Sequence, residues 1–230
     1  MLISQRYRNT QSIAAVLSCL AALFGFATAA ASTKVHVVDG DTLWIDGTTY
    51  RIAGIDAPEA GQKCAKAGGG TWPCGKAAVG AMQDLAGSGE VRCDSRGLDD
   101  YGRTLAVCFA DGVDIGGSLV DKGLAWSFRK YSLDYAGAED AAHAKRVGVW
   151  QAETEAPWDF RAHRWDVEQQ VAPKGCPIKG NINRDDERIY HAPWSPWYTR
   201  TKIDEAHGER WFCTEGEALA AGWRAPRWGN

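Results

Sequence analysis

The stretch from Val37 to Glu59 constrains the fold most, because its pattern is typical of a β-hairpin followed by a short exit loop. Two runs of strand-forming residues flank an Asp-Gly turn. Since a hairpin returns on itself, Asp41 at the start of one strand can approach Asp56 at the end of its partner. Arg51 lies on the second strand, and Glu59 follows Asp56 closely. Three carboxylates beside an arginine predict a site for a hard metal ion that faces an anionic group.

A second charged segment, residues 99–106, decides how the hairpin is interpreted. Alone, the hairpin is explained more simply by Asp-Gly turns whose acids are only solvated. However, Asp-Gly-Asp-Thr, Gly-Ile-Asp-Ala-Pro-Glu and Tyr-Gly-Arg occur here together and in this order. In these motifs the chain, from about residue 34 to 150, resembles the staphylococcal nuclease (thermonuclease) family.

The first 31 residues are typical of a secretory signal peptide. Arg6 and Arg8 precede an apolar run and a small-residue cleavage site. The run is too short for a membrane helix, and no later segment could span a bilayer. A lipid-attachment box ending at Cys19 is the alternative, but the apolar stretch before it is brief. We therefore expect a secreted or periplasmic protein with no membrane association after signal cleavage.

The charge of the mature chain limits how it can bind a polyanion. Without Arg6 and Arg8 it keeps 24 of its 26 basic residues against 29 acidic ones, a formal charge of −5. Tight non-specific binding to nucleic acid depends on many Lys and Arg contacts. This charge argues against a coating or architectural protein, so any contact with nucleic acid should be local and catalytic.

Residues 32–150 form the predicted nuclease domain, in which strand patterns alternate with helical ones. The predicted strands are Lys34–Asp39, Thr42–Asp46, Thr48–Ile55, Glu90–Asp94 and Thr104–Ala110. The predicted helices are Gly75–Leu85, Ile115–Lys122 and Leu133–Arg146. This order is compatible with a five-stranded Greek-key β-barrel with about three helices, an α+β arrangement. The family resemblance implies the same OB-fold barrel.

The remainder of the chain is predicted to contain a linker and a small module. Residues 151–172 are charged and aromatic, and we interpret them as a linker that docks on the barrel. Residues 173–230 hold five of the eleven tryptophans and predict a miniature β-rich module. Phrases around Cys176 and Cys213 resemble a module appended to some secreted bacterial proteins. That resemblance implies no firm function.

The family resemblance also implies a metal site. Asp41 and Asp56 match its two aspartate ligands, and Ala57 would add its backbone carbonyl. The family's type member has a threonine at this last position, but only the carbonyl is used. Ca²⁺ suits such a site, because it accepts about six to eight oxygen ligands in loose geometry.

Three further residues match the catalytic groups of the family. Glu59 matches the glutamate that acts as general base on the attacking water. Arg51 and Arg103 match the two phosphate-binding arginines. A guanidinium can donate two parallel hydrogen bonds to a phosphate, which a lysine cannot. The alternative for Arg103 is that it only pairs with Asp99 or Asp100.

Substrate contacts are expected from Tyr101, Arg129 and Tyr131, with two departures from the family pattern. Asp100 stands where the type member has a lysine, so one cationic contact becomes acidic. Arg129 stands where a base-stacking tyrosine is expected, although its planar guanidinium could stack on a base. These changes concern substrate affinity and preference rather than the type of reaction.

Six cysteines remain after loss of Cys19, an even number that suits an oxidising compartment. Their spacing favours three near-neighbour disulfides: Cys64–Cys74, Cys93–Cys108 and Cys176–Cys213. A zinc site built from Cys176, His191 and Cys213 is the alternative for the last pair, although it lacks an obvious fourth ligand.

These observations predict a monomeric, Ca²⁺-dependent endonuclease that hydrolyses DNA and RNA. The resemblance implies products with 3′-phosphate ends. The alternative is a non-catalytic nucleic-acid-binding OB-fold module with a C-terminal targeting domain. The complete set of acids and arginines argues against that alternative.

Overall fold

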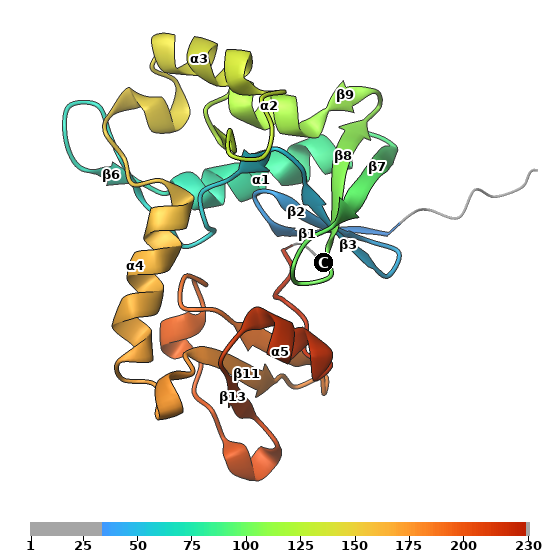
Figure 1. Ribbon diagram of the computed structural model, residues 1–230, viewed down its shortest axis with the longest axis vertical. Helices are drawn as coiled ribbons and strands as arrows, with labels where there is room; N and C mark the ends of the chain where they lie inside the picture. The colour runs from blue at the N-terminus through green and yellow to red at the C-terminus, as the bar shows by residue number, and fades with distance from the viewer. Residues whose placement is uncertain (1–33, 229–230) are drawn as a thin grey trace, which may run out of the picture. The chain divides into compact units, whose positions relative to one another are not determined.

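The computed structural model describes residues 34–228, and the predicted signal peptide lies outside them. One mixed sheet joins β1 (Val35–Asp39), β2 (Thr42–Ile45), β3 (Thr48–Ile52), β8 (Thr104–Ala110) and β7 (Val91–Leu98), in that spatial order. Only the β3–β8 pair is parallel. β9 (Val113–Asp114) adds to β8. Figure 1 shows the blue hairpin strands beside the green β7 and β8, although these segments are far apart in sequence.

The hairpin forms as its turn residues predict. Asp46 and Gly47 both have positive φ, at 44° and 96°, which matches the twist of a tight two-residue hairpin turn. The resulting register sets Thr42 opposite Arg51. Arg51 therefore lies opposite the first residue of β2, beside the turn formed by Gly40 and Asp41, which we call the acidic turn.

The predicted strand Thr48–Ile55 is broken in two. Gly54 has a φ of +77°, a conformation that side-chain-bearing residues rarely adopt, and it turns the chain out of the sheet. The continuation, β4 (Ile55–Asp56), pairs instead with β10 (Trp126–Ser127). Between residues 34 and 228 the backbone ladder therefore stays open, with β1 and β7 as its edges, rather than closing as a five-stranded barrel.

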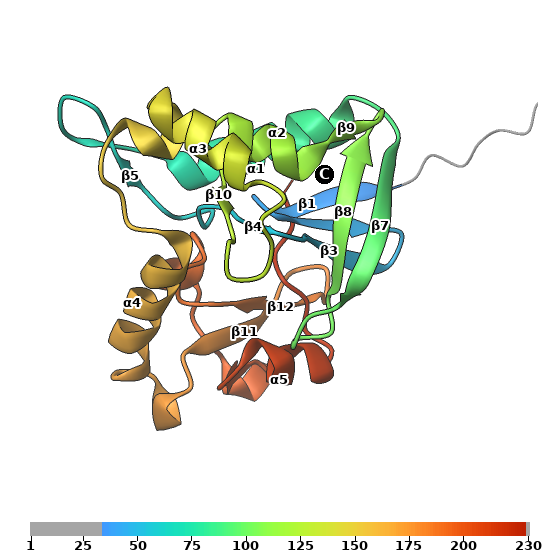
Figure 2. The ribbon, with the colours of Figure 1, turned by 45° about the horizontal axis from the view of Figure 1, so that its top comes forward.

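Three helices lie together on one side of the sheet (Figure 2). They are α1 (Cys74–Gly87), α2 (Ile115–Asp121) and α3 (Ala136–Ala144), close to the predicted ranges. Asp114 caps α2 by accepting a hydrogen bond from the Gly117 amide. Leu43, Met82 and Leu119 are fully buried between helices and sheet, each stabilising the fold by about 1.5–3 kcal/mol.

A further helix lies where the sequence predicts a linker. α4 (Pro157–Gln169) starts with Pro157 in its first turn, where a missing amide hydrogen has no cost. Trp158 stacks on Phe128 with ring centroids 5.7 Å apart, which fixes the start of α4 against the nuclease part. Short 3-10 turns precede and follow it at Gly148–Gln151 and Pro173–Gly175.

The C-terminal region has a small sheet and core of its own. β11 (Ile178–Ile182) pairs on either side with β12 (Arg188–His191) and β13 (Arg210–Phe212), and α5 (Glu215–Ala220) follows. Two 3-10 turns, Tyr198–Arg200 and Glu205–His207, lie in the connection between β12 and β13. The core consists of Ile178, Tyr190, Phe212, Ala218 and Trp223.

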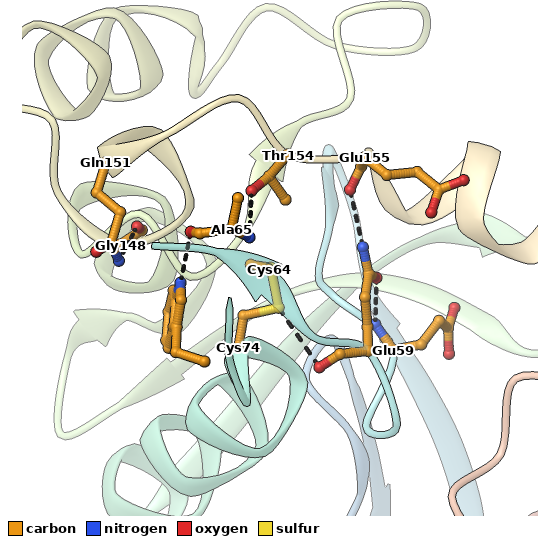
Figure 3. The surroundings of a disulfide bond; sticks show 10 residues. Glu59, Cys64, Ala65, Cys74, Gly148, Gln151, Thr154 and Glu155 are labelled. Atoms are coloured by element: carbon orange, nitrogen blue, oxygen red, sulfur yellow. Dashed lines mark hydrogen bonds between the residues drawn. A yellow bond between two sulfur atoms is a disulfide. The ribbon is translucent and has the colours of Figure 1, made fainter. Parts of the chain in front are cut away.

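The structure contains the three expected disulfides, Cys64–Cys74, Cys93–Cys108 and Cys176–Cys213. The zinc alternative is wrong, because the sulfur atoms of Cys176 and Cys213 are bonded to each other. The Cys64–Cys74 bond links α1 to the short hairpin of β5 (Cys64–Ala65) and β6 (Thr71–Trp72) (Figure 3). Within residues 34–228, no helix is both long and apolar enough to cross a membrane.

Candidate active site

A buried ion-pair cluster lies where the hairpin meets its exit loop. Arg51 Nη1 lies 2.8 Å from Asp41 Oδ2, and Arg51 Nη2 lies 2.9 Å from Asp56 Oδ1. Asp56 is completely buried and Asp41 nearly so. A buried carboxylate is tolerated only when it is paired or hydrogen-bonded, so the contacts with Arg51 offset part of the cost of burying these two aspartates.

The acidic turn approaches α1 closely. A side chain at Gly40 would meet the Cβ atoms of Ala57 and Ala78 at 2.9 Å, so only glycine fits without displacement. Asp41 Oδ1 accepts a hydrogen bond from the Thr42 hydroxyl at 2.8 Å, and its Oδ2 accepts one from the Ala57 amide at 3.3 Å. Burial acts to raise the pKa of Asp41, but Arg51 and Thr42 outweigh it and lower that pKa below its ordinary value.

Asp39 orders the same turn without joining the Arg51 ion pairs. Its Oδ1 accepts a hydrogen bond from the Gly40 amide at 2.8 Å. Burial, together with the negative charge of Asp41, raises the pKa of Asp39 to about 7. Asp39 therefore shapes the turn through its hydrogen bond to the Gly40 amide.

Glu59 is held by its backbone while its carboxylate stays in the cluster. The Glu59 amide donates to Gln62 Oε1 at 3.1 Å, and Gln62 Nε2 donates to the Glu155 carbonyl at 2.8 Å (Figure 3). A side chain at Gly75 would lie 1.7 Å from the Glu59 carbonyl oxygen, so α1 also packs directly on this loop. Burial and the neighbouring Asp39 raise the pKa of Glu59 well above its usual range, although Arg161 acts in the opposite direction.

Arg161 of α4 is a site residue that the sequence interpretation missed. Its Nη1 lies 3.0 Å from Asp56 Oδ1 and 2.6 Å from Glu59 Oε1, while Nη2 lies 2.7 Å from Asp56 Oδ2. α4 is polar on most sides, so its sequence lacks the apolar periodicity that would predict a helix at Arg161. Gln62 was missed as well, because its role depends on a partner that is distant in sequence.

Arg103 and Tyr101 lie on the turn between β7 and β8. Arg103 Nε pairs with Asp99 Oδ2 at 2.6 Å, and the amides of both Tyr101 and Arg103 donate to Asp99 Oδ1. The ion pair with Asp99, weighed above as an alternative, is therefore present. Asp99 engages only the Nε edge of the guanidinium, and the described residues give Arg103 Nη1 and Nη2 no hydrogen-bond acceptor.

A cavity of about 1080 Å³ connects these groups. Its lining includes the predicted residues Asp41, Arg51, Glu59, Tyr101, Arg103 and Tyr131, together with Arg161. Asp56 and Ala57 lie beneath this lining and contact it through Arg51 and Asp41. The C-terminal region also contributes to the cavity wall, which the sequence patterns did not predict. Its lining residues include Tyr190, Trp194, Trp197, Arg224 and Trp228.

Arg129 is outside the set of described residues that line this cavity. Its Nε pairs with Glu139 Oε2 at 2.6 Å, and its Nη2 contacts Asp140 and the Ala136 carbonyl. Glu139 in turn accepts a hydrogen bond from the Ser127 amide at 2.9 Å. Arg129 thus ties α3 to β10 in this structure, and its role in substrate binding stays a prediction.

The donor chemistry of the cluster suits Ca²⁺, since buried carboxylates and a backbone carbonyl are hard oxygen ligands. The arrangement, however, is one in which guanidinium groups neutralise the acids. Asp56 Oδ1 accepts hydrogen bonds from both Arg51 and Arg161, and Asp56 Oδ2 accepts one from Arg161. Accordingly, no group of three or more His, Cys, Asp or Glu side chains in residues 34–228 is arranged to hold a metal ion.

Comparisons with known proteins identify the family of this chain. A family model described as staphylococcal nuclease homologue matches residues 49–152. The succinoglycan biosynthesis protein ExoI of Rhizobium meliloti is 35% identical over 153 residues, which cover 64% of this chain and 79% of that protein. A micrococcal nuclease of Shigella flexneri is 30% identical over 145 residues, covering 55% and 78% of the two chains. The chain belongs to the staphylococcal nuclease family.

Membership of the staphylococcal nuclease family implies an OB-fold and makes the chain a nuclease, a hydrolase of phosphodiester bonds. An uncharacterized endonuclease of Haemophilus influenzae is also 34% identical over 123 residues, covering 50% of this chain and 64% of that one. A second family model, described as ArfC, matches residues 161–225. Its match begins at Arg161 and ends after the C-terminal sheet.

Proposed function

We propose that this nuclease is a secreted or periplasmic, Ca²⁺-dependent endonuclease that acts on DNA and RNA and leaves 3′-phosphate ends. The observation that carries the proposal is the convergence of Asp41, Arg51, Asp56 and Glu59 in one buried cluster beside a large cavity. Three disulfides support an oxidising compartment, which is where such bonds persist.

Asp41, Asp56 and the Ala57 carbonyl are the residues that would hold Ca²⁺. When bound, the ion would supply positive charge to the phosphoryl oxygens of the substrate. The lowered pKa of Asp41 supports this role, because a metal ligand must be deprotonated. The buried setting supports it too, since charge interactions are stronger away from water.

Glu59 is the proposed general base. A base works best when its pKa lies near the operating pH, and burial moves the pKa of Glu59 upward in that direction. A water in the cavity would pass its proton to a Glu59 carboxylate oxygen as the water oxygen attacks phosphorus. The bond from phosphorus to the 5′-oxygen then breaks, the departing 5′-oxygen takes up a proton from solvent water, and the phosphate stays on the 3′-oxygen.

Arg51 and Arg103 are the proposed phosphate ligands. Arg103 suits this role because Asp99 orders its Nε edge, while Nη1 and Nη2 have no acceptor among the described residues. Two parallel hydrogen bonds from a guanidinium match the geometry of phosphate oxygens. Tyr101 and Tyr131 are exposed aromatic residues at the same cavity, where bases could stack on them regardless of sequence.

We also propose the finer organisation of the chain: a signal peptide at 1–31, an OB-fold barrel domain at 32–150, a linker at 151–172 and a module at 173–230, acting as a monomer. The match to the nuclease family model over residues 49–152 supports the OB-fold assignment. The contacts of Arg161 indicate that the linker also contributes to the site.

Plasmid nicking by the protein lacking residues 1–31 tests this function. Cleavage should occur with Ca²⁺, stop with a chelator and return when Ca²⁺ is restored. The new 3′ ends should block polymerase extension until a 3′-phosphatase removes the phosphate. Equal cleavage with and without chelator would overturn the metal assignment. Binding of oligonucleotides without cleavage in either condition would favour the non-catalytic alternative.

A further inference from the structure

Arg161 occupies the acid cluster in the manner of a bound cation. Its Nη1 and Nη2 make a two-pronged contact with the two oxygens of Asp56, at 3.0 Å and 2.7 Å. Nη1 also reaches Glu59 Oε1 at 2.6 Å. One guanidinium therefore bridges a proposed metal ligand and the proposed general base.

The cluster has little capacity left for a metal ion while Arg161 is in place. Each carboxylate oxygen has two lone-pair positions, and Asp56 Oδ1 already accepts from both Arg51 and Arg161. Asp56 is fully buried, so water does not screen the repulsion between a guanidinium and a nearby divalent ion. Arg161 and a metal ion thus compete for the same oxygens.

Arg161 can leave without moving its helix. α4 is anchored at its start by the Trp158–Phe128 stack and further along by Arg164, whose Nε donates to the Pro193 carbonyl at 3.2 Å. The Arg161 side chain is 24% exposed and already lines the cavity. A rotation of this long, flexible side chain would carry the guanidinium from the carboxylates into that space.

We propose that Arg161 is an intramolecular competitor of the metal ion, so that α4 sets how readily the site loads Ca²⁺. In the resting form Arg161 neutralises Asp56 and Glu59, and metal binding requires the Arg161 side chain to withdraw. This inference rests on the proposed function, because it takes Asp56 as a metal ligand. It adds a residue from outside the region matched by the nuclease family.

Calorimetric titration of Ca²⁺ into the whole mature protein, without nucleic acid, measures this competition. If the Arg161-free state is a minor one, populated at 10% or less, Arg161→Gln should lower the Kd for Ca²⁺ by about tenfold or more. Arg161→Lys should give an intermediate Kd, because an ammonium cannot make the two-pronged contact. The matched control, Arg184→Gln at an exposed position, should leave the Kd unchanged.

An unchanged or higher Kd in a folded Arg161→Gln protein would overturn the proposal. If that variant fails to fold, the arginine side-chain NMR signals of the wild-type protein decide instead. Saturating Ca²⁺ should shift and sharpen the Arg161 signal, and a signal that does not respond would equally overturn the proposal. If the wild-type protein cleaves DNA with Ca²⁺ but Arg161→Gln leaves the Kd for Ca²⁺ unchanged, only the proposed competition is refuted. If the wild-type protein neither binds Ca²⁺ nor cleaves DNA, the proposed function is refuted as well.

Discussion

Asp56 illustrates how burial and pairing shape the site at the scale of single residues. It has no solvent exposure, yet two arginines from different parts of the chain contact it. Arg51 was predictable, because it shares a hairpin with Asp41 and the register of a hairpin is set locally. Arg161 was not, because it lies more than a hundred positions away in a polar helix.

Arg103 offers a direct test of the phosphate-binding role. We expect Arg103→Ala to lower kcat/KM on DNA by about 10²–10³-fold, since it removes a preorganised donor to the phosphate. Arg103→Lys should recover only part of this loss, because lysine keeps the charge without the paired donors. Steady-state cleavage rates check both. Arg92→Ala is the control, because Arg92 pairs with Asp94 on the exposed side of β7. Near wild-type rates for a folded Arg103→Ala protein would show that Arg103 does not bind the phosphate.

At the scale of elements, sequence patterns located the strands and helices of the nuclease part but not their interruptions or α4. The strand patterns predicted β1, β2 and β8 at nearly their observed positions, but only the first half of β7, which continues to Leu98. The break at Gly54 depends on packing, since a side chain there would crowd Ser132 and Tyr135. α4 has few buried residues, so the periodicity that marks an amphipathic helix is weak.

The C-terminal sheet should respond to pH through His191 on β12. Burial, with Arg200 and Lys179 nearby, lowers the pKa of His191 from 6.5 to about 4. Between these values the unfolded chain binds a proton that the folded one does not, so stability is full above about pH 6.5 and falls towards pH 4. The total loss should be about 3 kcal/mol.

Denaturant unfolding monitored by tryptophan fluorescence, at several pH values from 7 to 4, measures this loss. His191→Gln should flatten the pH dependence of the free energy of unfolding, because glutamine does not titrate in this range. His207→Gln is the matched control, since His207 is exposed on a 3-10 turn and pairs with Asp204. A pH dependence that is the same in His191→Gln and wild type would assign the effect to another group.

At the scale of the whole molecule, the cavity depends on residues from both halves of the sequence. The Trp228 amide donates to the Val37 carbonyl, which brings the end of the described chain to β1. Arg227 lies over the Trp44 ring, 4.0 Å from its centroid, and Trp197 packs on Trp228 at 4.6 Å. Such contacts come from tertiary packing, so the tryptophans of the C-terminal region could be counted in the sequence but not assigned to the cavity wall.

Plasmid nicking with Glu59→Gln in the presence of Ca²⁺ measures whether the buried acid cluster is the catalytic centre of this nuclease. This variant keeps the size of the side chain, but it removes the ability to accept a proton as a base and the negative charge that pairs with Arg161. We expect a rate lower than wild type by about 10²–10⁴-fold with unchanged circular dichroism, while Glu90→Gln, a change at an exposed position, should keep the wild-type rate. A folded Glu59→Gln protein that nicks plasmid at the wild-type rate would show that the catalytic centre lies elsewhere.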